Sequence, residues 1–140
     1  ALLIGAEEYP HLDIGGYLDR ISRIAERIKD RVGLELEPVR LIQELNRSLF
    51  DEEGYRGNSE DYYDPKNSFL NEVIDRRIGI PITLALLYIE IGQRMARLIA
   101  REIYGYDLIL LRPDLHVAWR GNRAPGKPAA LAALVTGHAR

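Results

Sequence analysis

PITLALLYIEIGQRMARLIAREI, residues 81–103, is the stretch that decides the fold of this chain, because it predicts the longest helix. Pro81 suits the first helical position, where its missing N–H would have no intrahelical partner. The first half of the stretch is apolar on nearly every side, which is typical of a helix at the buried centre of a domain. Gly105 marks its end. We therefore expect a central helix at 82–103 with the other elements packed around it.

Three more helices are predicted before the central one. Apolar residues recur at three- and four-residue spacing over 13–32, with Asp13 as N-cap and Gly33 at the C-terminal end. A second amphipathic segment covers 38–50, where a proline suits the first helical position. A shorter helix is predicted within 67–79.

After the central helix the pattern changes to short strands. Two apolar runs separated by Pro113-Asp114, residue types favoured in tight turns, predict a β-hairpin over 107–120. A glycine- and proline-rich loop follows, and an alanine-rich segment at 129–136 predicts a short last helix.

The predicted fold class is therefore α+β and predominantly helical. We expect four to five helices around the buried helix 82–103, a small β-hairpin at 107–120 and a short C-terminal helix. Residues 1–95 would form the helical part, and residues 96–140 a tail that packs on it to give one compact domain.

Composition narrows the classes of function. Hydrophobic residues make up 46% and charged residues 29% of the chain, the balance of a soluble globular domain. The net charge is −2 without a basic stripe, which disfavours nucleic acid as a partner. There is no cysteine, which removes disulfides and thiolate catalysis and fits a reducing cytoplasm. The longest apolar run, 78–89, is too short to span a membrane.

Several sequence blocks in the first two thirds of the chain carry a family resemblance. They read YRGN at 55–58, NSFLNEV at 67–73 and RRIGIPIT at 76–83. With these blocks in this order, residues 1–95 resemble the SirB-type branch of the transglutaminase-like superfamily.

The resemblance implies a catalytic cysteine at the start of the central helix in active members, where the helix dipole stabilises a thiolate. In this chain Pro81 stands at that position and Thr83 is the nearest hydroxyl. Members of the SirB-type branch also lack the cysteine, and they look like non-catalytic or regulatory proteins. The resemblance therefore implies that this chain is not an enzyme.

The last third of the chain carries a different resemblance. It reads YG at 104–105, LRPD at 111–114 and HVAWRG at 116–121. Residues 96–138 resemble the C-terminal end of class A flavoprotein aromatic hydroxylases, and the chain thus looks chimeric, whether by natural fusion, engineering or computational generation. It has no Gly-x-Gly-x-x-Gly fingerprint after a strand, so FAD, NADPH or any other cofactor is not expected.

A polar, tyrosine-rich stretch at 51–65 is predicted to be a loop. It suggests an acidic, aromatic surface that binds a basic partner protein, with the tyrosines as contact anchors. The alternative is a solvated loop whose tyrosines cap the helical core. The candidate binding residues are Asp51, Glu52, Glu53, Tyr55, Glu60, Asp61, Tyr62 and Tyr63.

Two other functions remain open. Thr83 with His116, oriented by Asp107 or Asp114, would be a degenerate transglutaminase-like or hydrolase site, against the alternative of a packed helix threonine and a strand histidine. Self-association through the apolar central helix would follow if the hairpin failed to cover it. The three histidines have no metal-site spacing, so no metal is expected. We expect a non-enzymatic interaction or regulatory module that acts through the loop or through self-association.

Overall fold

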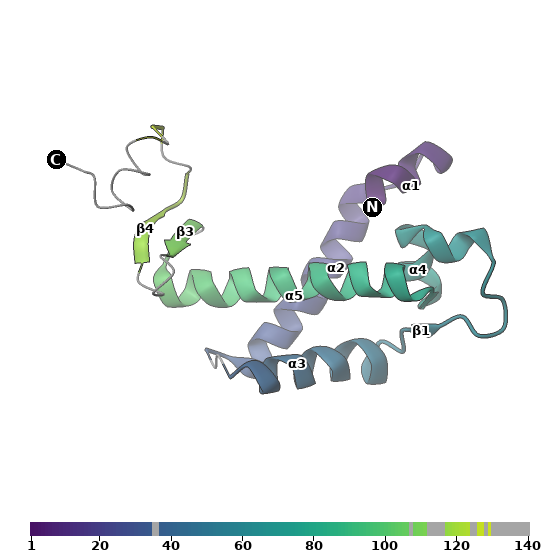
Figure 1. Ribbon diagram of the computed structural model, residues 1–140, viewed down its shortest axis with the longest axis horizontal. Helices are drawn as coiled ribbons and strands as arrows, with labels where there is room; N and C mark the ends of the chain where they lie inside the picture. The colour runs from purple at the N-terminus through teal and green to yellow at the C-terminus, as the bar shows by residue number, and fades with distance from the viewer. Residues whose placement is uncertain (35–36, 107, 112–116, 124–125, 128, 130–140) are drawn as a thin grey trace. The chain divides into compact units, whose positions relative to one another are not determined.

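A computed structural model describes residues 1–34, 37–106, 108–111, 117–123, 126–127 and 129 of the chain. The chain divides into two compact units, Ala1–Ala96 and Arg97–Arg140. One helix, α5 (Pro81–Tyr104), crosses the border between them (Figure 1).

The first unit is built from helices, as predicted. Asp13 Oδ1 accepts a hydrogen bond from the Gly16 N–H at 3.0 Å, and Gly33 ends the same helix with a φ of 62°. Within the described residues the fold is predominantly helical with five α-helices, which confirms the predicted class. The helical elements are α1 (Leu2–Glu8), α2 (Ile14–Val32), α3 (Pro38–Asn46), the π-helix η1 (Arg47–Glu52), the 3-10 helix η2 (Pro65–Ser68), α4 (Leu70–Arg76) and α5.

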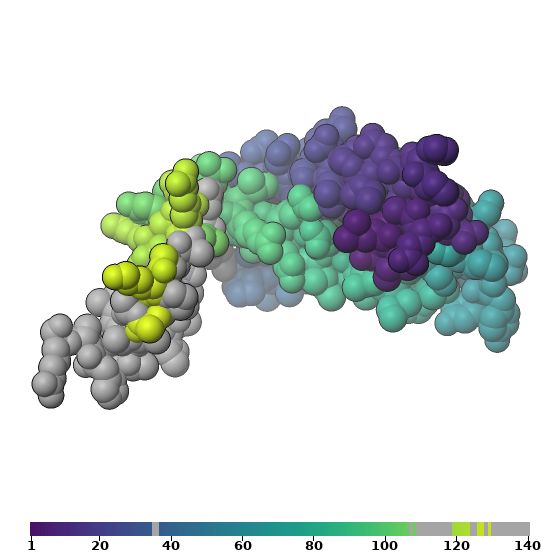
Figure 2. Space-filling model, turned by 90° about the horizontal axis from the view of Figure 1, so that it is seen from above, coloured from purple at the N-terminus to yellow at the C-terminus, as the bar shows by residue number. Residues whose placement is uncertain are grey.

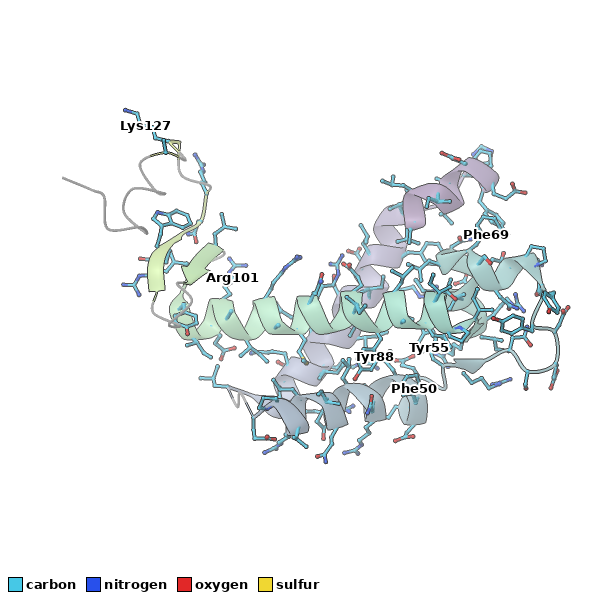
Figure 3. The ribbon with its side chains drawn as sticks, viewed as in Figure 1. Phe50, Tyr55, Phe69, Tyr88, Arg101 and Lys127 are labelled. Atoms are coloured by element: carbon cyan, nitrogen blue, oxygen red, sulfur yellow. The ribbon has the colours of Figure 1, made fainter. Side chains whose placement is uncertain are left out.

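The core of this unit lies where α2, α3, α4 and α5 meet. α1 packs on α2 and α4, and Figure 2 shows it in purple. A Cβ at Gly5 would stand 2.7 Å from Asn71 Oδ1, so α1 approaches α4 closely there. On the other side, Phe50 of η1 stacks on Tyr88 of α5 with ring centroids 6.2 Å apart (Figure 3). The largest fully buried aliphatic side chains of this unit are Ile21, Ile28, Leu49, Val73, Ile74, Leu87 and Ile91.

Helix α5 has the predicted length, but it is not buried on every side. Its inward stripe repeats every four residues through Leu87, Ile91 and Met95. Ile82 and Ile89 on the opposite side are 65% and 53% exposed. A helix surrounded by a few others contacts them along one face, and apolar composition alone does not say how much of the circumference is covered.

The stretch 51–65, predicted as loop, contains regular structure at two places. Glu53 N–H donates to Ser48 O at 3.0 Å, a five-residue step that closes the π-helix η1. Strand β1 (Arg56–Gly57) pairs in parallel with β2 (Ile78–Gly79). The prediction of a continuous loop is therefore wrong. A two-residue parallel bridge joins segments about twenty residues apart, and such a pairing leaves no periodic signal in the sequence.

The second unit contains the predicted hairpin. Strand β3 (Leu108–Leu111) pairs with β4 (Val117–Gly121) in antiparallel register, with Leu110 opposite Trp119. The hairpin is confirmed, while its turn and the helix predicted at 129–136 lie outside the described residues, apart from Ala129. In the described part of the chain, no helix is long and apolar enough to cross a membrane.

Candidate functional site

The loop at 58–64 connects β1 to η2, and a buried asparagine holds its backbone in place. The Asn67 side chain donates to Asp61 O at 2.8 Å and to Tyr62 O at 3.1 Å. It accepts from Asn58 Nδ2 at 3.1 Å. Asn67 is only 1% exposed, so these bonds replace water at a buried amide. The loop therefore has a fixed conformation.

Thr83 ties this loop to the central helix. Its hydroxyl donates towards Asn67 O at 2.8 Å and Ile80 O at 3.0 Å, and the residue is buried. Carbonyl oxygens only accept, so the Thr83 proton is held between them and is not directed at a base. For the alternative catalytic set, the structure thus gives Thr83 a structural bond, while His116 and Asp114 lie outside the described residues.

The loop faces solvent over residues 59–63. Its acidic and aromatic residues, Glu60, Asp61, Tyr62 and Tyr63, are hereafter called the tyrosine loop. Tyr62 is 55% and Tyr63 89% exposed, and their rings meet edge to face at 5.4 Å. No ion pair joins Glu60 or Asp61 to a cation within the described ranges. The loop presents two aromatic rings and two free carboxylates from a fixed backbone.

Tyr55 lies elsewhere, although the sequence grouped it with the other two tyrosines. It is only 4% exposed and belongs to the core (Figure 3). Burial raises the pKa of the Tyr55 hydroxyl, and the nearby Glu53 carboxylate raises that pKa further. Tyr55 is therefore a core residue and not part of an exposed contact surface.

Glu52 and Glu53 are neutralised by arginines from distant parts of the chain. Glu52 forms a bidentate pair with Arg31, both bonds at 2.8 Å. Glu53 pairs with Arg27 and Arg77. The hydrogen bonds from Arg31 lower the pKa of the Glu52 carboxyl, although its partial desolvation acts the other way. The acidity that the local sequence suggests around these residues is thus compensated in the fold, whereas Asp51 is exposed.

Asp64 ends the loop and is also engaged. Its carboxylate accepts from the Lys66 N–H at 2.9 Å and pairs with Arg76 at 2.9 Å. The backbone bond from Lys66 lowers the pKa of the Asp64 carboxyl most, and Arg76 adds to that lowering. Asp64 therefore caps η2 and anchors the loop.

Pro81 begins α5, as predicted, at the position where the resemblance implies a cysteine nucleophile in active relatives. The residues that sequence reasoning missed are Asn58 and Asn67, which form the buried support of the loop. Both lie in the blocks that carry the transglutaminase-like resemblance, and that was the available signal. No cluster of three or more potential metal ligands occurs in the described ranges, and of the three histidines only His11 lies in them.

Known proteins are similar to parts of the chain. A UPF0162 protein of Xylella fastidiosa (strain Temecula1) is 43% identical over 96 residues, which cover 68% of this chain and 34% of that protein. A UPF0162 protein of Vibrio cholerae is 37% identical over 49 residues, 35% of this chain and 18% of that protein. The chain thus spans about a third of the length of the Xylella relative.

A human relative matches a shorter part of the chain. F-box only protein 21 of Homo sapiens is 36% identical over 55 residues, which cover 39% of this chain and 9% of that protein. No solved structure matches the chain. The model of the transglutaminase-like superfamily matches residues 16–100, a segment that contains most of α2, all of α3 and α4, the tyrosine loop and most of α5. The chain therefore belongs to the transglutaminase-like superfamily.

Proposed function

We propose that this chain is a non-enzymatic interaction module whose binding surface is the tyrosine loop. The observation that carries the proposal is the exposed pair Tyr62 and Tyr63 on a backbone fixed by the buried Asn67. Tyrosine is enriched among the residues that dominate binding energy at interfaces. A loop that is ordered before binding loses little conformational entropy when it binds.

The charge of the loop indicates the kind of partner. Glu60 and Asp61 directly precede the two tyrosines and carry no ion pair among the described residues. A basic protein segment would supply the missing cations, and it would place a lysine ammonium or an arginine guanidinium over a tyrosine ring. This proposal narrows the surface expected from the sequence to residues 60–63.

The absence of catalysis is part of the proposal. Pro81 offers no nucleophile at the helix start, and the buried Thr83 hydroxyl is bonded to two carbonyls. The alternative, a degenerate hydrolase, requires Thr83 to release these bonds and to meet His116.

An array of twelve-residue peptides graded in lysine and arginine content tests the module. Retention of the labelled chain should rise with basic content, and the Tyr62→Ser/Tyr63→Ser variant should bind at least tenfold more weakly. Glu7→Gln/Glu8→Gln removes two exposed acids of α1 and is a control for the overall negative charge of the chain, so it should leave retention unchanged. Equal retention of the tyrosine variant and the parent chain would reject the loop as the binding surface.

Self-association is a second candidate, favoured by a specific observation. Ile82, Leu86 and Ile89 form a stripe on α5, and they are 65%, 45% and 53% exposed. Association of two copies would remove these side chains from water. Light scattering should then give twice the chain mass of 15.9 kDa. Replacing Ile82 and Ile89 by lysine should return the monomer, and a parent chain that is monomeric at high concentration excludes this candidate.

For the last third of the chain we propose an origin in a flavoprotein hydroxylase tail joined near Met95-Ala96. The border between the two compact units, at Ala96/Arg97, supports a joint at this point. The absence of cysteine in all 140 residues favours the cytoplasm as the location. Helix α5 runs through the border, so the joint is tested with a chain that ends at Tyr104. If the hairpin tail has a separate origin, this shortened chain should keep the unfolding midpoint of the whole chain in urea, and a large loss of stability would reject the joint.

A further inference from the structure

A hollow of about 410 Å³ lies beside α2, on residues that neither the tyrosine loop nor the alternative catalytic set uses. Its apolar lining comes from two helices and one connecting segment: Ile21 and Ile24 of α2, Ile74 of α4, and the buried Tyr55 between η1 and β1. The volume is in the range of ordinary ligand sites. An apolar lining suits a ligand that brings an apolar group.

The rim of the hollow carries four arginines: Arg20, Arg23, Arg27 and Arg77. Each guanidinium has five N–H donors and no acceptor. Arg27 and Arg77 share the single carboxylate of Glu53. Each guanidinium can bind a carboxylate of its own through two parallel hydrogen bonds. A second carboxylate would therefore give Arg27 and Arg77 one partner each.

Arg23 is the least satisfied of the four arginines. Its one hydrogen bond within the described ranges is from Nε to Asp19 O at 3.4 Å, and no carboxylate there lies within ion-pair distance. Arg20, in contrast, is held by Asp75 and by Ile74 O at 3.1 Å. Arg23 thus has free donors at the rim.

Acidic residues also line the rim, and they limit which anions fit. Glu26 and Asp30 both border the hollow, and Asp30 pairs with Lys29 at 3.7 Å. Net charge at the rim is therefore close to neutral. The four arginines outnumber the three carboxylates of the lining, Glu26, Asp30 and Glu53. Guanidinium donors are therefore in excess, and carboxylates placed at the arginines would satisfy them.

A second hollow of about 310 Å³ continues along the same helix. It is lined by Asp13, Gly16 and Tyr17, and it shares Arg20 and Arg23 with the first. The two hollows together follow α2 from residue 13 to residue 30, which is about 25 Å at 1.5 Å per residue. An extended peptide of about seven residues covers that length at 3.3 Å per residue. The shape therefore favours a peptide over a compact small molecule.

We propose that this arginine groove binds an acidic peptide segment that also carries apolar side chains. Carboxylates of the peptide pair with Arg23 and with the Arg27–Arg77 pair, and a leucine or aromatic side chain lies on the apolar lining formed by Ile24 and Tyr55. A free phosphate would satisfy the guanidinium groups and leave the apolar lining uncovered. The groove shares no residue with the tyrosine loop. Its proposed partner is acidic, whereas the partner proposed for the loop is basic.

Backbone amide NMR spectra of the whole chain test the proposal. The probe is the peptide acetyl-Glu-Leu-Glu-Phe-Glu-Leu-Glu-amide, with its glutamine counterpart and inorganic phosphate as comparisons. Saturable shifts are expected at residues 20–27, 53–55 and 74–77 with the acidic peptide. Binding should be at least fivefold weaker for the glutamine peptide.

The Arg23→Gln variant should lower the affinity at least fivefold, and it should keep the parent spectrum because Arg23 makes no ion pair in the described part of the chain. Arg97→Gln, at an exposed arginine of α5 outside the groove, is the matched control. The proposal is overturned if the peptide gives no saturable shifts, if phosphate reproduces them at equal affinity, or if Arg23→Gln binds as well as Arg97→Gln.

Discussion

Two acidic pairs close together in the chain, Glu52-Glu53 and Glu60-Asp61, have opposite roles in the structure. The first pair is tied to Arg27, Arg31 and Arg77, and the side chains of Glu52 and Glu53 are only 33% and 16% exposed. The second pair faces solvent. The two pairs have the same chemistry, and they differ only in which cations the fold brings near. A local count of charges therefore describes the unfolded segment better than it describes the folded surface.

The three tyrosines that the sequence grouped together give the sharpest test. Tyr55→Ala should destabilise the chain by about 3–5 kcal/mol, because it removes a buried aromatic ring and leaves a cavity. Tyr62→Ala and Tyr63→Ala should each change stability by less than about 0.5 kcal/mol, since both rings are exposed. Urea unfolding of the three variants measures the difference. Similar midpoints for all three would contradict the separation of Tyr55 from the tyrosine loop.

The next largest effect is expected at the support of the tyrosine loop. Asn67→Ala should cost about 2–3 kcal/mol, because it leaves loop carbonyls without their buried donor. Gln93→Ala, on the exposed side of α5, is a control that should leave stability unchanged. Hydrogen exchange at the amides of residues 58–64 should become faster in the Asn67 variant. Unchanged exchange there would show that Asn67 does not hold the loop.

Substitutions in the two acidic pairs are expected to change stability by less. Glu53→Gln should destabilise the chain by about 1 kcal/mol, because Arg27 and Arg77 lose their shared partner at a partly buried position. Glu60→Gln should have no measurable effect on stability. Thermal unfolding of the two variants in low and high salt compares them directly. A larger loss for Glu60→Gln would invert the comparison between the pairs.

The smallest expected effect is the dependence of stability on pH. The pKa values of Glu52 and Asp64 are lowered in the folded chain from their ordinary values of 4.5 and 3.8. Their contribution to stability is therefore complete above these values and is lost as the pH falls through the lower folded pKa values. Glu52→Gln should flatten the decline in melting temperature below pH 4.5. A decline of equal steepness in that variant would place the acid sensitivity on other groups.

Residue types explain which parts of the fold could be predicted. The capped helix α2 and the long helix α5 follow from local periodicity, an N-cap aspartate and a helix-starting proline, which act within a few residues. The hairpin β3–β4 follows from two apolar runs that Pro113-Asp114, residue types favoured in turns, separate in the sequence. The parallel bridge at Arg56 and Ile78 could not be predicted, because it depends on two segments that meet only after the helices have packed.

The candidate site, too, could be predicted only in part. The sequence placed an acidic, aromatic segment at 51–65, and residues 60–63 have that character in the fold. It could not show that Tyr55 turns into the core, that Asn67 fixes the loop, or that Arg31 of α2 neutralises Glu52. Each of these facts depends on residues five or more positions apart, so no local pattern carries it.

Sequence alone determined the helical class, the two long helices, the lack of cysteine and the resemblance of the first 95 residues to the transglutaminase-like superfamily. The tertiary structure decided which apolar side of α5 is covered, which carboxylates remain free and where Arg23 and its neighbours form a groove. The physical reason is one of range. Backbone propensity and capping act between neighbours, whereas burial and ion pairing depend on which distant side chains the packed helices bring together.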